Sequence, residues 1–153
     1  MPFRTESLRE TDFDAWVGLR AQLWPYESLE DLRSNAQELR ARGDRATVFV
    51  AKTGGEIVGF AEATLRVDYV NGSSTSPVAF LEGLYVVPEY RHQGIARALC
   101  TQIERWGARR GCTEFASDAL LENDLGHAVH AALGFRETER VVYFLKPIES
   151  SAT

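Results

Sequence analysis

Apolar and polar positions alternate over several stretches of the chain, which predicts strands. The clearest are residues 47–52 and 57–67, which the turn-forming pair Gly54-Gly55 joins as a hairpin. A nearly continuous apolar run over residues 78–87 predicts a central strand. Further stretches are predicted to complete the sheet: residues 2–8, residues 113–118, and one or two closing strands within residues 135–145.

Between these predicted strands, apolar residues recur at helical spacing. Residues 13–23 predict a first helix, and Ser28 with Asp31 supplies an N-cap for a second helix that ends at Gly43. Two later helices are predicted over residues 97–110 and 124–133. No repeat or domain boundary interrupts the pattern. We therefore expect one α/β (α+β) domain over residues 1–153, with a mixed central sheet flanked by helices.

Composition narrows the class of protein. The chain has 153 residues, of which 44% are hydrophobic and 25% are charged, as in a soluble globular domain. No apolar run approaches the roughly 20 residues that span a bilayer. Residues 1–6 lack a secretory apolar region, so a cytoplasmic location is expected, and residues 150–153 are expected to form a frayed tail. The net charge of −5 argues against nucleic acid as a partner and favours a cationic substrate.

Histidine and cysteine residues do not form a metal-binding pattern. The cysteines are Cys100 and Cys112, and the histidines are His92, His127 and His130. Their spacing matches no zinc motif, so no metal site is expected. Buried free thiols are the expected state of the two cysteines.

The stretch Arg91-His92-Gln93-Gly94-Ile95-Ala96 lies between the predicted central strand and the helix that follows it. A strand, a short basic loop with a glycine and then a helix leave backbone N–H groups where a phosphate can bind. Gly94 permits close approach of the backbone. The spacing matches neither the dinucleotide-binding motif nor the Walker motif. An ordinary turn with a structural glycine explains the stretch about equally well.

Further motifs later in the chain decide between these alternatives, because they follow the loop in the order of a known family. The Arg-x-x-Gly-x-Ala pattern resembles the acyl-CoA pyrophosphate loop of the GNAT N-acetyltransferases. Asn123, His130 and Gly134-Phe135 follow at that family's spacing. The resemblance covers residues 80–135 and implies the GNAT fold and acetyl-CoA as the donor.

The resemblance also implies which residues bind acetyl-CoA. Backbone groups of the central strand would bind the pantetheine arm, and the loop from Arg91 and His92 onward would bind the pyrophosphate. The implied strand residues are Leu84, Tyr85 and Val86. The implied backbone N–H donors of the loop are those of Gln93, Gly94, Ile95, Ala96 and Arg97. Asn123 would add a polar contact to the pantetheine arm or a bridging water, although a helix cap explains that residue as well.

Catalytic roles follow from the chemistry of acetyl transfer, which needs a neutral amine, a polarised carbonyl and a proton for the thiolate. The resemblance implies that a backbone amide near Tyr85 polarises the thioester. Glu82 is a charged residue inside an apolar strand and could accept the amine proton through water. GNAT chains commonly have Tyr where His130 stands, so His130 is either the proton donor or a structural histidine. Tyr143 is a weaker candidate for the donor.

Local strings spread over the chain resemble one group of this family, the aminoglycoside 6′-N-acetyltransferases. The strings are Gln22-Leu23-Trp24-Pro25, Asp68-Tyr69-Val70-Asn71-Gly72, Phe80-Leu81-Glu82-Gly83, Arg105-Trp106-Gly107 and Ala116-Ser117-Asp118. The resemblance implies acetylation of the 6′-amine of an aminoglycoside and therefore antibiotic resistance. Carboxylates and aromatic side chains suit a polycationic ligand, which indicates Trp24, Tyr69, Glu82 and Asp118 as substrate-binding residues. Each of them also has a structural explanation: packing for the aromatic residues, a cap for Asp118 and a solvated strand face for Glu82.

Two other functions compete with this one. A GNAT enzyme could act on another amine, such as a polyamine, an amino acid or a protein N-terminus, and a silent acyl-CoA-binding module could serve regulation. A homodimer is expected, since related acetyltransferases commonly pair and the apolar residues 141–145 would be a liability as an exposed strand edge.

Overall fold

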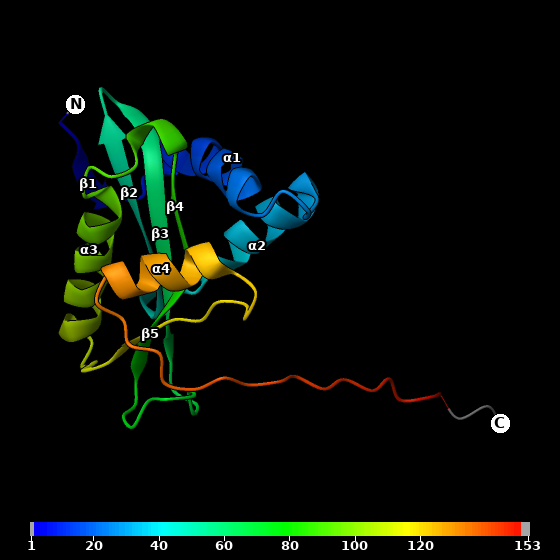
Figure 1. Cartoon of the computed structure of the whole chain (residues 1–153). Coiled ribbons are helices and arrows are strands. Elements are labelled where there is room, and N and C mark those ends of the chain that lie inside the picture. The colour runs from blue at the N-terminus through cyan, green and yellow to red at the C-terminus, as the bar shows by residue number, and fades with distance from the viewer. Residues whose placement is uncertain (1, 151–153) are drawn as a thin grey trace.

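A mixed five-stranded sheet with helices on both faces forms the body of this computed structural model, which describes residues 2–150 (Figure 1). The strand order is β1-β2-β3-β4-β5, with β1 to β4 antiparallel and β5 parallel to β4. The strands are β1 (Arg4–Ser7), β2 (Ala46–Thr53), β3 (Glu56–Arg66), β4 (Val78–Val86) and β5 (Phe115–Ala116). The helices are α1 (Phe13–Leu23), α2 (Leu29–Ala41), α3 (Ile95–Arg109) and α4 (Asp124–Ala132). Short 3₁₀ helices are η1 (Glu10–Asp12), η2 (Gly43–Arg45) and η3 (Pro88–Tyr90).

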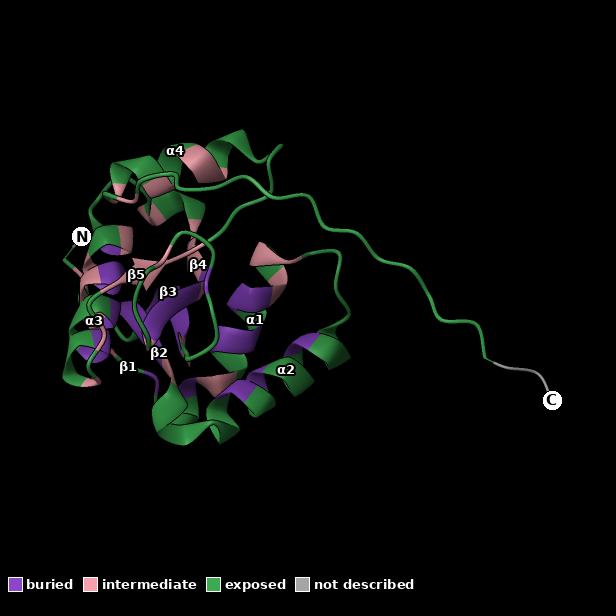
Figure 2. Cartoon of the chain, turned by 90° about the horizontal axis from the view of Figure 1, so that it is seen from below, coloured by how far each residue is buried: buried purple, intermediate pink, exposed green. Residues whose placement is uncertain are grey.

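Helix α3 covers one face of the sheet, and α1 and α2 cover the other (Figures 1 and 2). Leu99, Ile103 and Trp106 of α3 pack against small and branched strand residues on their side. Trp16 and Leu39 belong to the cluster that α1 and α2 form on the opposite face. Because both faces are covered, β3 is buried almost along its whole length. Within residues 2–150, no helix is long and apolar enough to cross a bilayer.

Local signals in the sequence set the starts and turns of these elements. The Ser28 Oγ accepts a hydrogen bond from the Asp31 N–H at 3.0 Å, which confirms the predicted N-cap of α2. Gly54 and Gly55 have φ angles of 58° and 86°. A type I′ two-residue hairpin turn requires positive φ at both central residues, which glycine adopts without strain. The predicted hairpin of β2 and β3 is therefore confirmed.

A β-bulge in β4 re-aims the side chain of Glu82. In the pairing of β3 with β4, Glu62 is opposite Gly83 and Ala63 is opposite Leu81, so Glu82 is the extra residue. Leu81 packs into the core on the α3 side. A Cβ on Gly83 would instead lie 2.9 Å from the Trp24 ring, on the α1 side. The bulge therefore places Glu82 and Gly83 in succession on the face that α1 and α2 cover.

Strand β5 is shorter than predicted. It pairs with β4 only at Ala79 opposite Phe115 and Phe80 opposite Ala116. Beyond Phe80, β4 continues to Val86 with no strand on that side among residues 2–150. This leaves an open edge of β4 in the half of the strand that leads to the loop at residues 91–96.

The closing strands predicted within residues 135–145 are wrong for the single chain. Residues 135–150 have neither helix nor strand. Phe135 still packs against the Phe115 and His130 rings. From residue 136 onward the segment is exposed and leads away from the body (Figures 1 and 2). Phe144 and Leu145 are 92% and 99% exposed. A strand needs a partner for its backbone groups, and within residues 2–150 this segment pairs with none. Of the predicted tail, only Ser150 lies within the described residues.

A buried cationic side chain joins β2 to the N-terminal segment. The Lys52 Nζ lies 3.0 Å from an Asp12 oxygen and 3.5 Å from a Glu6 oxygen. The Arg9 N–H donates to Asp12 at 3.0 Å. Burial alone would raise the pKa of Asp12, but the Arg9 N–H and Lys52 together lower it below its ordinary value. The pKa of Glu6 is lowered for similar reasons, with burial opposed by Lys52 and Arg9.

This cluster predicts a loss of stability in acid. A carboxyl group whose pKa is lowered by folding contributes stability above its unfolded pKa, near 4, and loses it as pH falls through the folded pKa. We expect the free energy of unfolding to decline below about pH 4, and to decline less in Asp12→Asn. Urea unfolding at a series of pH values measures both slopes. Asp44→Asn, at a fully exposed carboxylate, serves as the control. Equal slopes in Asp12→Asn and wild type would contradict the assignment.

Candidate functional site

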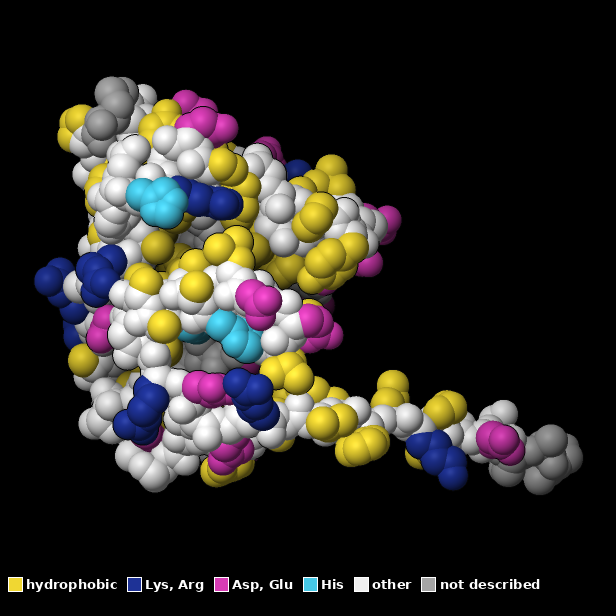
Figure 3. Space-filling view, viewed as in Figure 1, with side chains coloured by type: hydrophobic (Ala, Val, Ile, Leu, Met, Phe, Trp, Pro, Cys, Tyr) yellow, Lys and Arg dark blue, Asp and Glu magenta, His cyan; other side chains and the backbone are white. Residues whose placement is uncertain are grey.

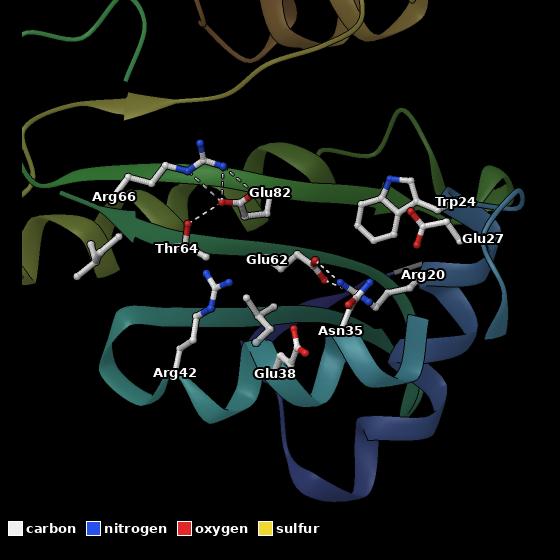
Figure 4. A pocket seen from close by; sticks show the side chains of 12 residues that line it. Arg20, Trp24, Glu27, Asn35, Glu38, Arg42, Glu62, Thr64, Arg66 and Glu82 are labelled. Carbon is white, nitrogen blue, oxygen red and sulfur yellow. Dashed lines mark hydrogen bonds and ion pairs between the residues drawn. The ribbon is translucent and has the colours of Figure 1, made fainter. Parts of the chain in front are cut away.

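A polar cavity of about 480 Å³ lies between the sheet and helices α1 and α2 (Figure 4). Its lining combines carboxylates, guanidinium groups and one tryptophan: Arg20, Trp24, Glu27, Asn35, Glu38, Leu39, Arg42, Glu62, Thr64, Leu65, Arg66 and Glu82. The strand contributions come from the second half of β3 and from the bulge of β4. The cavity can therefore offer several hydrogen-bond acceptors and negative charges to a polar ligand.

An ion pair between Arg20 and Glu62 forms the buried part of the cavity wall. Arg20 Nη2 and Nε lie 2.8 Å and 3.0 Å from the two Glu62 oxygens, and Trp16 Nε1 donates to Glu62 at 3.1 Å. Arg20 Nη1 also donates to the Leu32 carbonyl of α2 at 2.8 Å. The side chains of Arg20 and Glu62 are only 7% and 2% exposed. This network joins α1, α2 and β3 and leaves Glu62 fully partnered.

Glu82 lies in the same cavity but is more accessible. It accepts a hydrogen bond from Thr64 Oγ1 at 2.6 Å and contacts Arg66 through both carboxylate oxygens. Its side chain is 28% exposed. Thr64 and Arg66 on β3 thus provide partners for this charge within an otherwise apolar strand. Figure 4 shows the three side chains meeting over the sheet.

The cavity brings together two of the four predicted substrate-binding residues. Trp24, at the end of α1, lies over Gly83, where a Cβ would be only 2.9 Å from its ring, and Arg20 stacks 4.9 Å from the same ring. Glu82 is the second. Tyr69 is 73% exposed in the loop after β3, and Asp118 is exposed just after β5; neither lines the cavity. Their contact with a substrate stays a prediction.

Sequence analysis missed the second carboxylate of the cavity wall. Glu62 occupies an apolar strand, which is the same signal that singled out Glu82. Arg20 gave no comparable signal, because an arginine on a helix is usually solvated. Its partner stands 42 positions later in the chain, so only the folded structure shows the pair.

The loop before α3 has the backbone conformation of an anion-binding turn. His92 and Gly94 have φ angles of 64° and 86°, and Gly94 caps α3 without a side-chain hydrogen bond. The first backbone N–H groups of a helix have no intrahelical acceptor, which applies here to Ile95, Ala96 and Arg97. Together with the open edge of β4, this geometry suits a ligand with an extended arm and a phosphate. The individual contacts of Leu84, Tyr85, Val86 and Gln93 with such a ligand stay predictions.

Two residues near this loop make contacts within the chain. Arg91 Nε donates to the Val86 carbonyl at 2.8 Å, so its side chain folds back onto the end of β4. The Tyr85 hydroxyl donates to Gln22 Oε1 at 2.9 Å and so links β4 to α1. These contacts fix the junction between the cavity and the loop.

Asn123 caps helix α4, and His130 lies within it. Asn123 Oδ1 accepts a hydrogen bond from the Gly126 N–H at 2.9 Å, which confirms the cap explanation, while its contact with acetyl-CoA stays a prediction. His130 Nδ1 donates to the Gly126 carbonyl at 2.6 Å, and Nε2 lies 2.7 Å from Ser117 Oγ. Both ring nitrogens thus have partners in this chain. His130 therefore holds α4 to the segment after β5, and its role as proton donor stays a prediction.

The cysteines are free thiols outside the cavity. Burial raises the pKa of Cys100 to about 12, and burial also raises the pKa of Cys112. Protonated thiols are poor nucleophiles. Chemistry at this site therefore relies on carboxylates, hydroxyl groups and backbone donors.

Comparisons with known proteins agree on one family. The model of the acetyltransferase (GNAT) family matches residues 6–135. An aminoglycoside N(6′)-acetyltransferase type 1 of Acinetobacter genomosp. 13 is 49% identical over 133 residues, which cover 87% of this chain and 90% of that protein. The enzyme of the same name from Salmonella typhimurium is 44% identical, over 91% of this chain and 95% of that protein.

Solved structures match over nearly the whole chain. The complex of AAC(6′)-Iy with the bisubstrate analogue CoA-S-monomethyl-acetylneamine superposes with a TM-score of 0.90 at 40% identity, covering 97% of this chain and all of that one. The apo structure of AAC(6′)-IG from Acinetobacter haemolyticus gives a TM-score of 0.91 at 42% identity, covering 95% and 99%. The predicted fold is therefore confirmed. The chain belongs to the acetyltransferase (GNAT) family.

Proposed function

We propose that this protein transfers the acetyl group of acetyl-CoA to the 6′-amine of aminoglycoside antibiotics and so confers resistance to them. The observation that carries the proposal is the position of Glu82. It lies in a carboxylate-lined cavity with a tryptophan wall, on the strand whose open edge leads to the anion-binding loop. Relatives at up to 49% identity are named aminoglycoside N(6′)-acetyltransferases, and AAC(6′)-Iy binds CoA and a neamine-derived analogue.

The chemistry of the cavity suits a ligand with several ammonium groups. Glu27 lines the cavity from the turn between α1 and α2, beside Trp24, and Glu38 lines it from α2 (Figure 4). Ammonium groups gain charge-assisted hydrogen bonds from such carboxylates, and Trp24 offers an aromatic face for a cation or a sugar ring. A protein of net charge −5 also attracts a polycation over a longer range.

The transfer step assigns a role to each group. Acetyl-CoA supplies the acetyl group and leaves as the thiol. Glu82 accepts a proton from the 6′-ammonium group, through water, so that the neutral nitrogen attacks the thioester carbon. The backbone N–H near Tyr85 would stabilise the negative charge that develops on the carbonyl oxygen. As the carbon–sulfur bond breaks, the nitrogen loses its second proton and the thiolate takes one up, so the products are the amide and the free thiol. His130 is the candidate donor, because Tyr143 is 82% exposed on the segment that leads away from the body.

A thiol-release assay tests the proposal. Purified protein with acetyl-CoA is given a panel of amines that contains a 6′-amino aminoglycoside, a polyamine, an amino acid and a short peptide. We expect rapid release of CoA only with the aminoglycoside. A preference for another amine would replace the proposed substrate, and tight CoA binding without turnover of any amine would refute an enzymatic role.

The working location and partners follow from the same proposal. We infer that the protein works in the cytoplasm, where acetyl-CoA is available. Its acidic net charge argues against nucleic acid as a partner. A homodimer is also proposed, because residues 136–150 are exposed throughout. Figure 3 shows hydrophobic side chains along this projecting segment. Its exposed apolar residues are Val141, Val142, Tyr143, Phe144, Leu145 and Ile148.

A second copy of the chain would bury that segment. So much exposed apolar surface is unfavourable in a soluble monomer, and an unpaired strand-forming segment favours association. We expect light scattering at micromolar concentration to give twice the 17.1 kDa chain mass, and removal of residues 136–153 to reduce it to the monomer. A species of 17 kDa for the intact protein would rule out the dimer.

A further inference from the structure

Arg66 holds the carboxylate that the proposed function assigns to the substrate. Its Nη2 lies 3.1 Å and 3.0 Å from the two Glu82 oxygens, and its Nε lies 3.3 Å from one of them. A substrate ammonium group placed on Glu82 would therefore lie beside a guanidinium group. Two cations on one carboxylate repel each other. Binding of an ammonium group at Glu82 is therefore favoured when Arg66 moves away from the carboxylate.

The surroundings of Arg66 permit such a movement. In the neighbouring pair, Arg20 and Glu62 are 7% and 2% exposed, and Arg20 is also tied to α2. Arg66 is 43% exposed, and within residues 2–150 its guanidinium group donates hydrogen bonds only to Glu82. Beyond these bonds it stacks on the Phe80 ring, 3.6 Å from the centroid. Ion pairs as exposed as this one are weak, so solvent can take over the guanidinium group readily.

We propose that Arg66 is a specificity-determining residue that acts as an internal counter-ion for Glu82 and is exchanged for an ammonium group of the substrate. This inference rests on the proposed function. In the free protein, Arg66 neutralises Glu82, and on binding it moves from the carboxylate toward solvent over Phe80. A ligand with a single positive charge only replaces one ion pair with another. A polycation that also reaches Glu27 and Glu38 gains further contacts, so the exchange selects for several ammonium groups.

The exchange predicts that removal of Arg66 improves binding. In Arg66→Gln, the internal competitor loses its charge, and we expect KM for a 6′-amino aminoglycoside to fall about two- to fivefold, as for an exposed ion pair. The dissociation constant measured by titration calorimetry without acetyl-CoA should fall by a similar factor. Arg42→Gln is the matched control, because it removes one positive charge from the same cavity at a side chain without an ion pair to Glu82.

A double variant isolates the specific pairing. In the Glu82→Gln background, Arg66→Gln should have no further effect on the dissociation constant, since no carboxylate remains to be released. An unchanged or raised KM in Arg66→Gln, or an equal fall in Arg42→Gln, would overturn the exchange while wild-type turnover still supports the proposed function. A wild-type protein that neither binds nor acetylates the aminoglycoside would overturn both.

Discussion

Glu82→Gln is expected to lower kcat/KM for a 6′-amino aminoglycoside about 100-fold, mainly through kcat, which is the usual contribution of a general base. Gln keeps the shape of the side chain and a hydrogen bond to Thr64, but it cannot accept the proton of the ammonium group. The bulge in β4 points this carboxylate into the cavity, so no neighbouring residue of the strand can replace it. Steady-state kinetics over a range of pH measure the change.

A second carboxylate of the cavity serves as the control for this variant. Glu38 lines the same cavity from α2 and carries the same charge. Glu38→Gln should raise KM only a few-fold, about as much as the loss of one solvated ion pair, and leave kcat near the wild-type value. Similar kinetics in the two variants would show that charge in the cavity matters and that Glu82 has no special role as a base.

Gly94→Asp is expected to weaken CoA binding roughly 100-fold or more, because it places a negative charge beside the pyrophosphate. Gly94 has a φ angle of 86° at the start of α3, where side chains are strained and anions are favoured. The added side chain thus opposes binding in two ways: it occupies space that the ligand would fill, and it carries a negative charge. Titration calorimetry with CoA on the folded variant measures the affinity.

Two further variants separate these contributions. Gly94→Asn has almost the same shape as Gly94→Asp without the charge, so the difference between them measures repulsion alone. Gly111 has a similar φ angle of 85° at the other end of α3, and a Cβ at either glycine meets no atom within 4 Å. Gly111→Asp should therefore share the backbone strain while binding CoA normally. Unchanged CoA affinity in Gly94→Asp would show that the donor binds elsewhere.

Local chemistry explains which parts of the fold could be predicted. Ser28 caps α2 and Gly54-Gly55 turns the β2–β3 hairpin through interactions within a few residues. The family motifs identified the fold because they occur in order along the chain. The prediction of closing strands within residues 135–145 was wrong because strand propensity cannot supply a pairing partner, and residues 2–150 contain none for this segment.

The composition of the cavity depends on contacts between distant residues. Glu82 was recognised as a charge in an apolar strand, but the bulge that directs it results from the register of β3 and β4. Arg66 lies on the preceding strand, and its pairing with Glu82 has no counterpart in the sequence pattern. The buried Arg20–Glu62 pair was missed for the same reason. The sequence pattern therefore singled out Glu82, and the structure added the groups that hold it.

The position of the transferred acetyl group is the decisive measurement for the proposed 6′-N-acetylation. Matched aminoglycosides with a 6′-amine and a 6′-hydroxyl group are incubated with the protein and acetyl-CoA, and mass spectrometry with NMR locates any acetyl group. We expect a single acetyl group on the 6′-nitrogen of the first compound and no product from the second. Equal acetylation of the 6′-hydroxy compound at another amine would contradict it.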